Sequence, residues 1–143
     1  MESSEIGSLI SRFENQELPS SEWTHEAHLI VGIWYVWHHP YERALNKVRN
    51  LIIKHNESVG TPNSDTEGYH ETLTRFWLNV ARSFIALNDF SSVESSCIEF
   101  VCSNYGSRDY PLTFYSRDCL FSVVARRQWV EPDLSMPDFL NVD

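Results

Sequence analysis

Apolar residues recur along most of the chain at the three- and four-residue spacing of helices that bury one face. In residues 8–16, for example, Leu9, Ile10 and Phe13 share a face, and Pro19 follows shortly after. No segment alternates apolar and polar residues in the way of a half-buried strand. The predicted helices cover residues 8–16, 22–38, 41–56, 67–87, a segment opened by Ser91, and 111–121, with a short extra helix that ends near 128.

Local signals mark where several of these helices begin. Ser64 with Glu67, and Ser91 with Glu94, each match the capping box, in which a serine and a glutamate three residues later bond to the first backbone N–H groups. Ser122 is a further candidate cap. The stretch before Glu67 reads ESVGTPNSDT and is the longest irregular segment, because its glycine, proline and Asn63 favour turns.

The segment 22–38 differs from the others in being apolar on nearly all sides, which favours a position in the middle of a bundle. With 143 residues, 42% of them hydrophobic, the chain can bury one core without disulfides or metal. We therefore expect an all-α fold, a single domain over 1–143 built as a bundle of about six helices with no sheet. The segment from about residue 130, VEPDLSMPDFLNVD, contains two prolines and is expected to run as an extended tail over the surface.

Charge and composition exclude several classes of protein. A net charge of −9 repels phosphate backbones, so we expect no nucleic acid as partner. The longest apolar stretch, residues 29–37, is too short to span a bilayer, so no membrane association is expected. The amino terminus lacks a secretory signal, and the three cysteines form no CxxC pair, which together favour a cytoplasmic location.

The strongest chemical signal is a set of histidines at two predicted helix beginnings. His25 and His28 stand one helical turn apart in WTHEAHL, and His70 lies in EGYHETLTRFW. Two imidazoles on one face plus a third from another helix can bind a divalent metal, zinc or iron, with positions left open. Glu71 or Glu26 would then be the fourth ligand or the general base.

Two other interpretations of these histidines stay open. Glu22-x-x-His25 and Glu67-x-x-His70 both match the ExxH spacing of di-iron helical bundles. Alternatively, the histidines are hydrogen-bonding groups at the edge of the core. His55 lies on an apolar helix face, which favours a core position.

Further polar residues near these helix beginnings are candidates for contacts with a substrate. The arginines can bind a carboxylate through two parallel hydrogen bonds. The predicted substrate-binding residues are Asn63, Thr74, Arg75 and Arg117.

The segments WTHEAHL, PNSDTEGYHETLTRFW and YSRDCLFSVVARRQWVEPDL are similar to a family of small bacterial all-helical proteins of unassigned function. The resemblance spans most of the chain and implies one intact helical domain, but no reaction. Two functions follow from the residues themselves. One is a metal-dependent enzyme that acts on a small molecule. The other is a non-enzymatic module that binds a small molecule or a protein, with structural histidines; the oligomeric state is left open.

Overall fold

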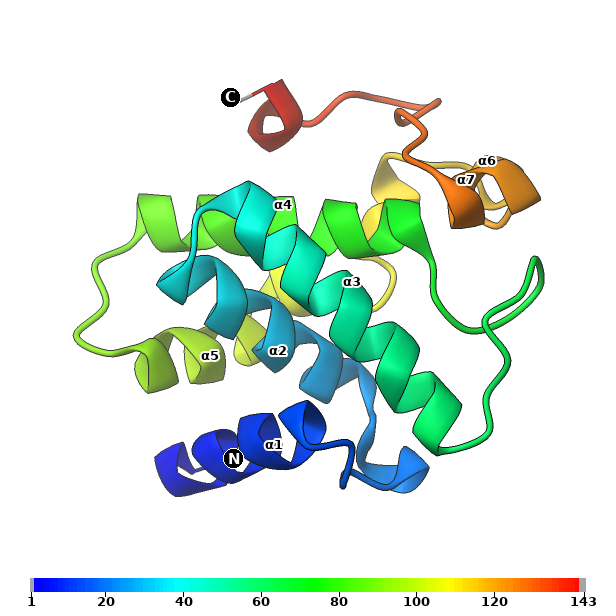
Figure 1. Ribbon diagram of the computed structural model, residues 1–143. Helices are drawn as coiled ribbons and strands as arrows, with labels where there is room; N and C mark the ends of the chain where they lie inside the picture. The colour runs from blue at the N-terminus through cyan, green and yellow to red at the C-terminus, as the bar shows by residue number, and fades with distance from the viewer. Residues whose placement is uncertain (1, 142–143) are drawn as a thin grey trace.

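The computed structural model describes residues 2–141, which fold into seven α-helices and four short 3-10 helices without any strand (Figure 1). The expected all-α fold is confirmed. The α-helices are α1 (Ser3–Glu14), α2 (His25–His38), α3 (Tyr41–Ser58), α4 (Glu71–Leu87), α5 (Val93–Cys102), α6 (Arg117–Leu120) and α7 (Val123–Arg127). The 3-10 helices are Ser20–Glu22, Asn104–Gly106, Tyr110–Thr113 and Asp138–Asn141.

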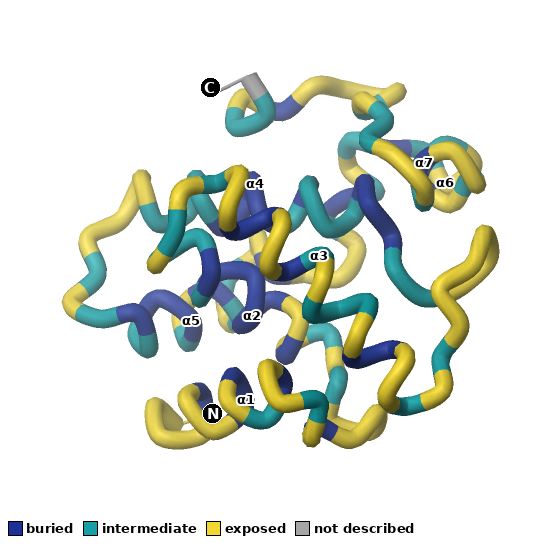
Figure 2. Tube along the Cα trace, in the orientation of Figure 1, coloured by how far each residue is buried: buried dark blue, intermediate teal, exposed yellow. Residues whose placement is uncertain are grey.

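Helix α2 lies at the centre of the bundle and packs against α1, α3, α4 and α5 (Figure 1). Seven of its residues are buried, and five of them, residues 29–33, are consecutive and therefore cover all sides of the helix. Figure 2 marks much of α2 as buried. This arrangement confirms the position expected from a segment that is apolar all round. The break before α3 comes at Pro40, whose ring cannot continue a helix.

Helix α4 begins four residues later than the Ser64–Glu67 pair predicts. Ser64 does not cap this helix. Its backbone N–H donates to the Glu67 carbonyl within the loop, at 2.9 Å. Gly68 then takes a positive φ of 84°, and His70 caps α4 by accepting the backbone N–H of Leu73. The left-handed residue at Gly68 interrupts the helix that the sequence pattern extends back to Glu67.

The later caps differ from the predictions to a smaller extent. Ser92, rather than Ser91, caps α5, and Ser122 caps α7 as predicted. Residues 111–121 do not form one continuous helix: a 3-10 helix at Tyr110–Thr113 is followed by the separate α6.

The segment after α7 returns across the bundle towards α4 (Figure 1). It has no regular helix between 128 and 137, and it is fixed by specific contacts. The Tyr115 hydroxyl donates to the Val130 carbonyl at 2.6 Å, and the ring of Phe139 packs edge-on against Phe76 with centroids 5.6 Å apart. Across the described chain, no helix has the length and apolar character needed to cross a membrane.

Candidate functional site

A pocket of about 750 Å³ opens among the first half of α2, the second half of α3, the first half of α4 and the segment 108–121. Its size lies within the range typical of small-molecule sites. Apolar side chains form much of its wall, including Trp23, Ile52, Leu73 and Trp77. Four of the six histidines of the chain also line it: His25, His28, His55 and His70.

His28 lines this pocket, and one of its two ring nitrogens is bonded to the backbone. Its Nδ1–H donates to the Thr24 carbonyl at 2.7 Å, and its ring lies against Trp23 with centroids 3.8 Å apart. The side chain keeps an exposed surface and also lines the pocket. Burial lowers the pKa of His28 to about 4, so the ring is neutral near pH 7. With Nδ1 protonated, Nε2 carries a lone pair that no residue among 2–141 uses.

His25 is held from the opposite ring nitrogen. Its Nε2–H donates to the Gly106 carbonyl at 2.8 Å, and its ring meets Trp77 edge-on. In the neutral ring the lone pair is therefore on Nδ1. This atom has no hydrogen-bond partner among the described residues, and it is not fully buried. His25 thus offers a second hydrogen-bond acceptor that is still accessible.

His70 differs because both of its ring nitrogens have protein partners. Nε2–H donates to the Leu120 carbonyl at 2.7 Å, and Nδ1 accepts the Leu73 N–H at 3.1 Å. Burial lowers the pKa of this histidine, which keeps the ring neutral and Nδ1 able to accept. His70 therefore acts as a helix cap that ties α4 to the end of α6, and it has no lone pair left for a ligand.

Among the described residues, His55 is the pocket histidine whose two ring nitrogens are both buried without partners. It is fully buried, as its apolar helix face predicts, but it also lines the pocket. Neither Nδ1 nor Nε2 has a hydrogen-bond partner within the described part of the chain. Its ring lies near two aromatic rings, with centroids 5.7 Å from Phe13 and 5.1 Å from Trp23. Leaving a buried polar group unpaired costs roughly 1–3 kcal/mol, so this ring needs a water or a ligand beside it.

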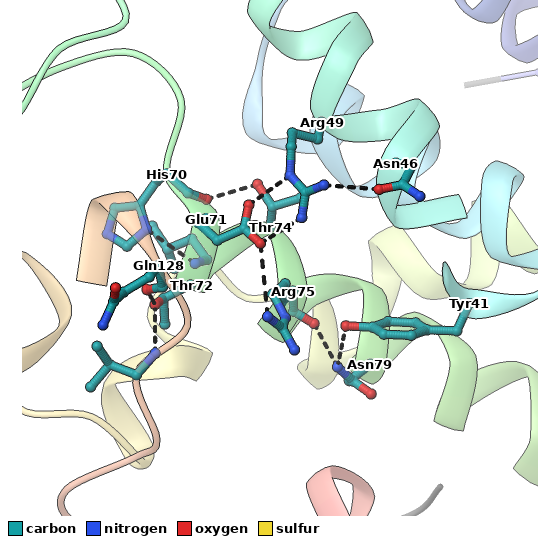
Figure 3. A network of polar contacts seen from close by, with 12 residues as sticks. Tyr41, Asn46, Arg49, His70, Glu71, Thr72, Thr74, Arg75, Asn79 and Gln128 are labelled. Carbon is teal, nitrogen blue, oxygen red and sulfur yellow. Dashed lines mark hydrogen bonds and ion pairs between the residues drawn. The ribbon is translucent and has the colours of Figure 1, made fainter. Parts of the chain in front are cut away.

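The two predicted catalytic glutamates lie outside the pocket lining. Glu71 is buried and accepts hydrogen bonds from Arg49 Nε and Nη2, at 2.9 and 2.7 Å (Figure 3). It also accepts one from the Tyr69 hydroxyl, at 2.7 Å. Burial alone would raise the pKa of Glu71, but the bonds from Arg49 and Tyr69 lower it. Glu71 is therefore a charged structural group, and Glu26 is exposed on the outer side of α2.

The four predicted substrate-binding residues divide into two pairs. Thr74 and Arg117 line the pocket, although the Thr74 hydroxyl donates to the His70 carbonyl at 2.8 Å. Asn63 holds the loop before α4 by bonding Asn56, the Ile53 carbonyl and the Tyr69 N–H. Arg75 lies over the ring of Trp129, 5.2 Å from its centroid, away from the pocket.

In this arrangement, the residues predicted as metal ligands do not form a good metal site. No three His, Cys, Asp or Glu side chains among residues 2–141 are placed to hold an ion. His70 is committed on both nitrogens, and Glu71 is paired with Arg49. For the di-iron alternative, Glu22 forms an ion pair with Arg12 at 3.0 Å. Metal binding stays a prediction, and these commitments count against it.

Arg108 and Trp77 are among the pocket residues that the sequence did not single out. Arg108 lines the pocket from a loop with no helical periodicity, and nothing in its neighbours distinguishes it. Trp77 stands beside the apolar stripe of α4, and its place at the pocket follows only from how α4 packs on α2. Neither position carries a local signal, because both depend on contacts between distant segments.

Comparisons of the chain with protein-family models, curated proteins and solved structures found no match. The resemblance noted from the sequence therefore stays a prediction, and the pocket must be interpreted from its own chemistry.

Proposed function

We propose that this protein binds a small organic molecule in the pocket between α2, α3 and α4. The observation that carries the proposal is the state of the histidines. His25, His28 and His55 line one pocket and keep ring nitrogens without a partner among residues 2–141, and those of His55 are fully buried. Buried polar groups are nearly always hydrogen-bonded, so an unsatisfied set around a cavity favours a ligand that completes it.

The pocket walls support the same function. The lining includes the large apolar side chains of Trp23 and Trp77, together with Leu73 and Ile52. Apolar walls with a few placed polar groups are typical of small-molecule sites. The walls supply affinity through burial, and the imidazoles supply orientation.

Gly32 offers a direct test because it lines the pocket on α2. A Cβ added there would lie 3.5 Å from Leu78 Cδ2, an ordinary contact, so Gly32→Ala fits. The longer side chain of Gly32→Leu would extend into the cavity. We expect compounds from a small-molecule library to shift the amide NMR signals of pocket residues in the wild type and in Gly32→Ala, but not in Gly32→Leu.

The result contradicts the proposal if no compound perturbs pocket signals, or if binding persists unchanged in a folded Gly32→Leu protein. Circular dichroism establishes that each variant is folded. Should Gly32→Leu not fold, Ser20→Trp replaces it, since Ser20 is an exposed residue of the same lining.

The second function, a metal-dependent enzyme, rests on the lone pairs of His25 Nδ1 and His28 Nε2. Two imidazoles with free lone pairs are a partial ligand set for zinc or iron. Metal analysis of protein purified without a nickel column tests it: stoichiometric zinc or iron that is lost in His28→Ala supports the enzyme, and metal-free protein supports the organic ligand.

A further inference from the structure

Two arginines in the pocket lining set the charge that a ligand encounters. Arg108 and Arg117 both line the pocket, where Asp109 is the one acidic residue. Within residues 2–141, neither guanidinium forms an ion pair or a side-chain hydrogen bond. Other arginines do pair: Arg12, Arg49 and Arg127 lie 3.0, 2.7 and 2.6 Å from carboxylate oxygens. In a chain of net charge −9, two unpaired cations on one pocket favour an anion.

The positive charge of Arg108 acts on His28, which lines the same pocket. Arg108 is close enough to His28 for its positive charge to disfavour the imidazolium form, alongside the larger effect of burial. An anionic group placed between them would meet the guanidinium directly. Charge-assisted bonds of this type are about twice as strong as neutral ones.

The imidazoles impose a second requirement. His28 Nε2 and His25 Nδ1 are acceptors when their rings are neutral, so the ligand must supply a hydrogen-bond donor. An ammonium group is a donor too, but Arg108 and Arg117 would repel it. A hydroxyl, an amide or a ring N–H satisfies the acceptors without that cost.

We infer that the ligand of this pocket is a small amphipathic carboxylate, with an aromatic or aliphatic body between Trp23 and Trp77, a neutral hydrogen-bond donor towards His25 and His28, and its anionic group towards Arg108 and Arg117. This inference rests on the proposed small-molecule function and specifies its ligand class.

The test uses a library of matched triplets, each an aromatic acid with its primary amide and its amine. A representative triplet is 4-hydroxyphenylacetate, 4-hydroxyphenylacetamide and tyramine. Affinities are measured by titration of pocket amide signals at low and at high salt. We expect the acids to bind at least about tenfold more tightly than the amides, with the amines weakest. Added salt should reduce the preference for acids, because Arg108 and Arg117 are exposed and salt screens their charges.

Variants separate charge from shape. Arg108→Gln with Arg117→Gln should bring the affinity of the acid to that of the amide, while the affinity of the amide changes less than about twofold. Arg43→Gln serves as control, since Arg43 is an exposed arginine on α3 outside the lining.

The outcomes distinguish the two proposals. If amides or amines bind as tightly as the acids, the carboxylate class is wrong and the small-molecule function stands. If the acids bind best but the double arginine variant keeps that preference, the assignment to Arg108 and Arg117 is wrong. If no member of any triplet shifts a pocket signal, the carboxylate class is wrong, and the general small-molecule library decides whether the pocket binds any ligand.

Discussion

His25 donates its Nε2–H to the carbonyl oxygen of Gly106, which lies 81 residues further along the chain, at 2.8 Å. The bond joins the first turn of α2 to the 3-10 helix after α5, and it fixes which nitrogen of His25 keeps its lone pair. Gly106 has no room for a side chain, because a Cβ there would lie 2.6 Å from the Phe100 carbonyl oxygen. One contact between distant segments thus sets both a tertiary restraint and the chemistry of a pocket residue.

Loss of this bond should destabilise the protein moderately. We expect His25→Ala to lower the free energy of unfolding by roughly 1–3 kcal/mol, since the Gly106 carbonyl loses its donor. Urea denaturation measures the change. Glu26→Ala, at the next and exposed position, should change it by less than about 0.5 kcal/mol. Equal effects at the two positions would mean that the bond to Gly106 contributes nothing.

His70 should behave as a structural cap. We expect His70→Asn to be less stable than the wild type and His70→Ala to be the least stable. Asparagine keeps a cap acceptor worth about 1 kcal/mol, while both variants lose the donor to the Leu120 carbonyl. Thermal melts rank the three proteins. If His70→Ala kept the stability of the wild type but lost bound zinc or iron, His70 would be a metal ligand and not a cap.

Gly68 should tolerate no side chain. Its φ is 84°, and a Cβ there would lie 2.2 Å from the Pro62 carbonyl oxygen. We expect Gly68→Ala to lower the free energy of unfolding by more than about 2 kcal/mol, because the left-handed strain and the clash add. The matched control is Gly7→Ala at an exposed position of helix α1, where an added Cβ has no atom within 4 Å and alanine should stabilise by about 0.5–1 kcal/mol. A mild effect at Gly68 would contradict the loop geometry.

The helices show how far the pattern of the sequence reaches. The end of α2 at His38 and the start of α3 at Tyr41 match the prediction, because Pro40 and the apolar spacing act locally. The start of α4 does not, because it depends on a left-handed Gly68 and on a cap by His70 that also bonds Leu120, 50 residues away. Local signals near Glu67 cannot reveal that long-range bond.

The candidate site shows the same division. The spacing of His25 and His28 correctly indicates that both share one region of α2, and both line the pocket. Which nitrogen each ring keeps free follows from bonds to Gly106 and Thr24, and the sequence does not encode the first of these locally. Glu71 follows His70 directly, yet the helix turns it towards Arg49 on α3 instead of the pocket.

The pH dependence of stability should reflect His28. Its pKa is about 4 in the folded protein and 6.5 without burial, so between these values the unfolded chain binds the proton more readily. Stability should therefore be intact above about pH 6.5 and fall as the pH drops towards 4. The free energy of unfolding, obtained from denaturation curves at several pH values, should depend less on pH in His28→Gln than in the wild type. Burial lowers the pKa of His55 and His70 also, so part of the slope will remain. An imidazole signal of His28 that titrates near 6.5 would contradict this expectation.

His55 should show a conflict between stability and binding. Replacing it by leucine removes two buried ring nitrogens that lack partners. We expect ligand-free His55→Leu to be more stable than the wild type by about 1 kcal/mol, and to bind the aromatic acids more weakly. Urea denaturation and ligand titration of the same samples measure both. A variant that is destabilised by more than about 1 kcal/mol would show that His55 has a partner in solution that the protein itself provides.

The most direct test of ligand binding in the pocket is the ¹⁵N spectrum of the imidazole rings, recorded with and without a saturating aromatic acid. In the free protein we expect His28 as the Nδ1–H tautomer and His25 and His70 as the Nε2–H tautomers. On addition of the acid, the His28 Nε2 signal, the His25 Nδ1 signal and the signals of His55 should shift, because these atoms gain a donor or a new neighbour. The His70 signals should stay in place, since both nitrogens keep their bonds to Leu120 and Leu73. Shifts confined to His70, or no imidazole shift with any compound that binds, would contradict the pocket as the site of binding.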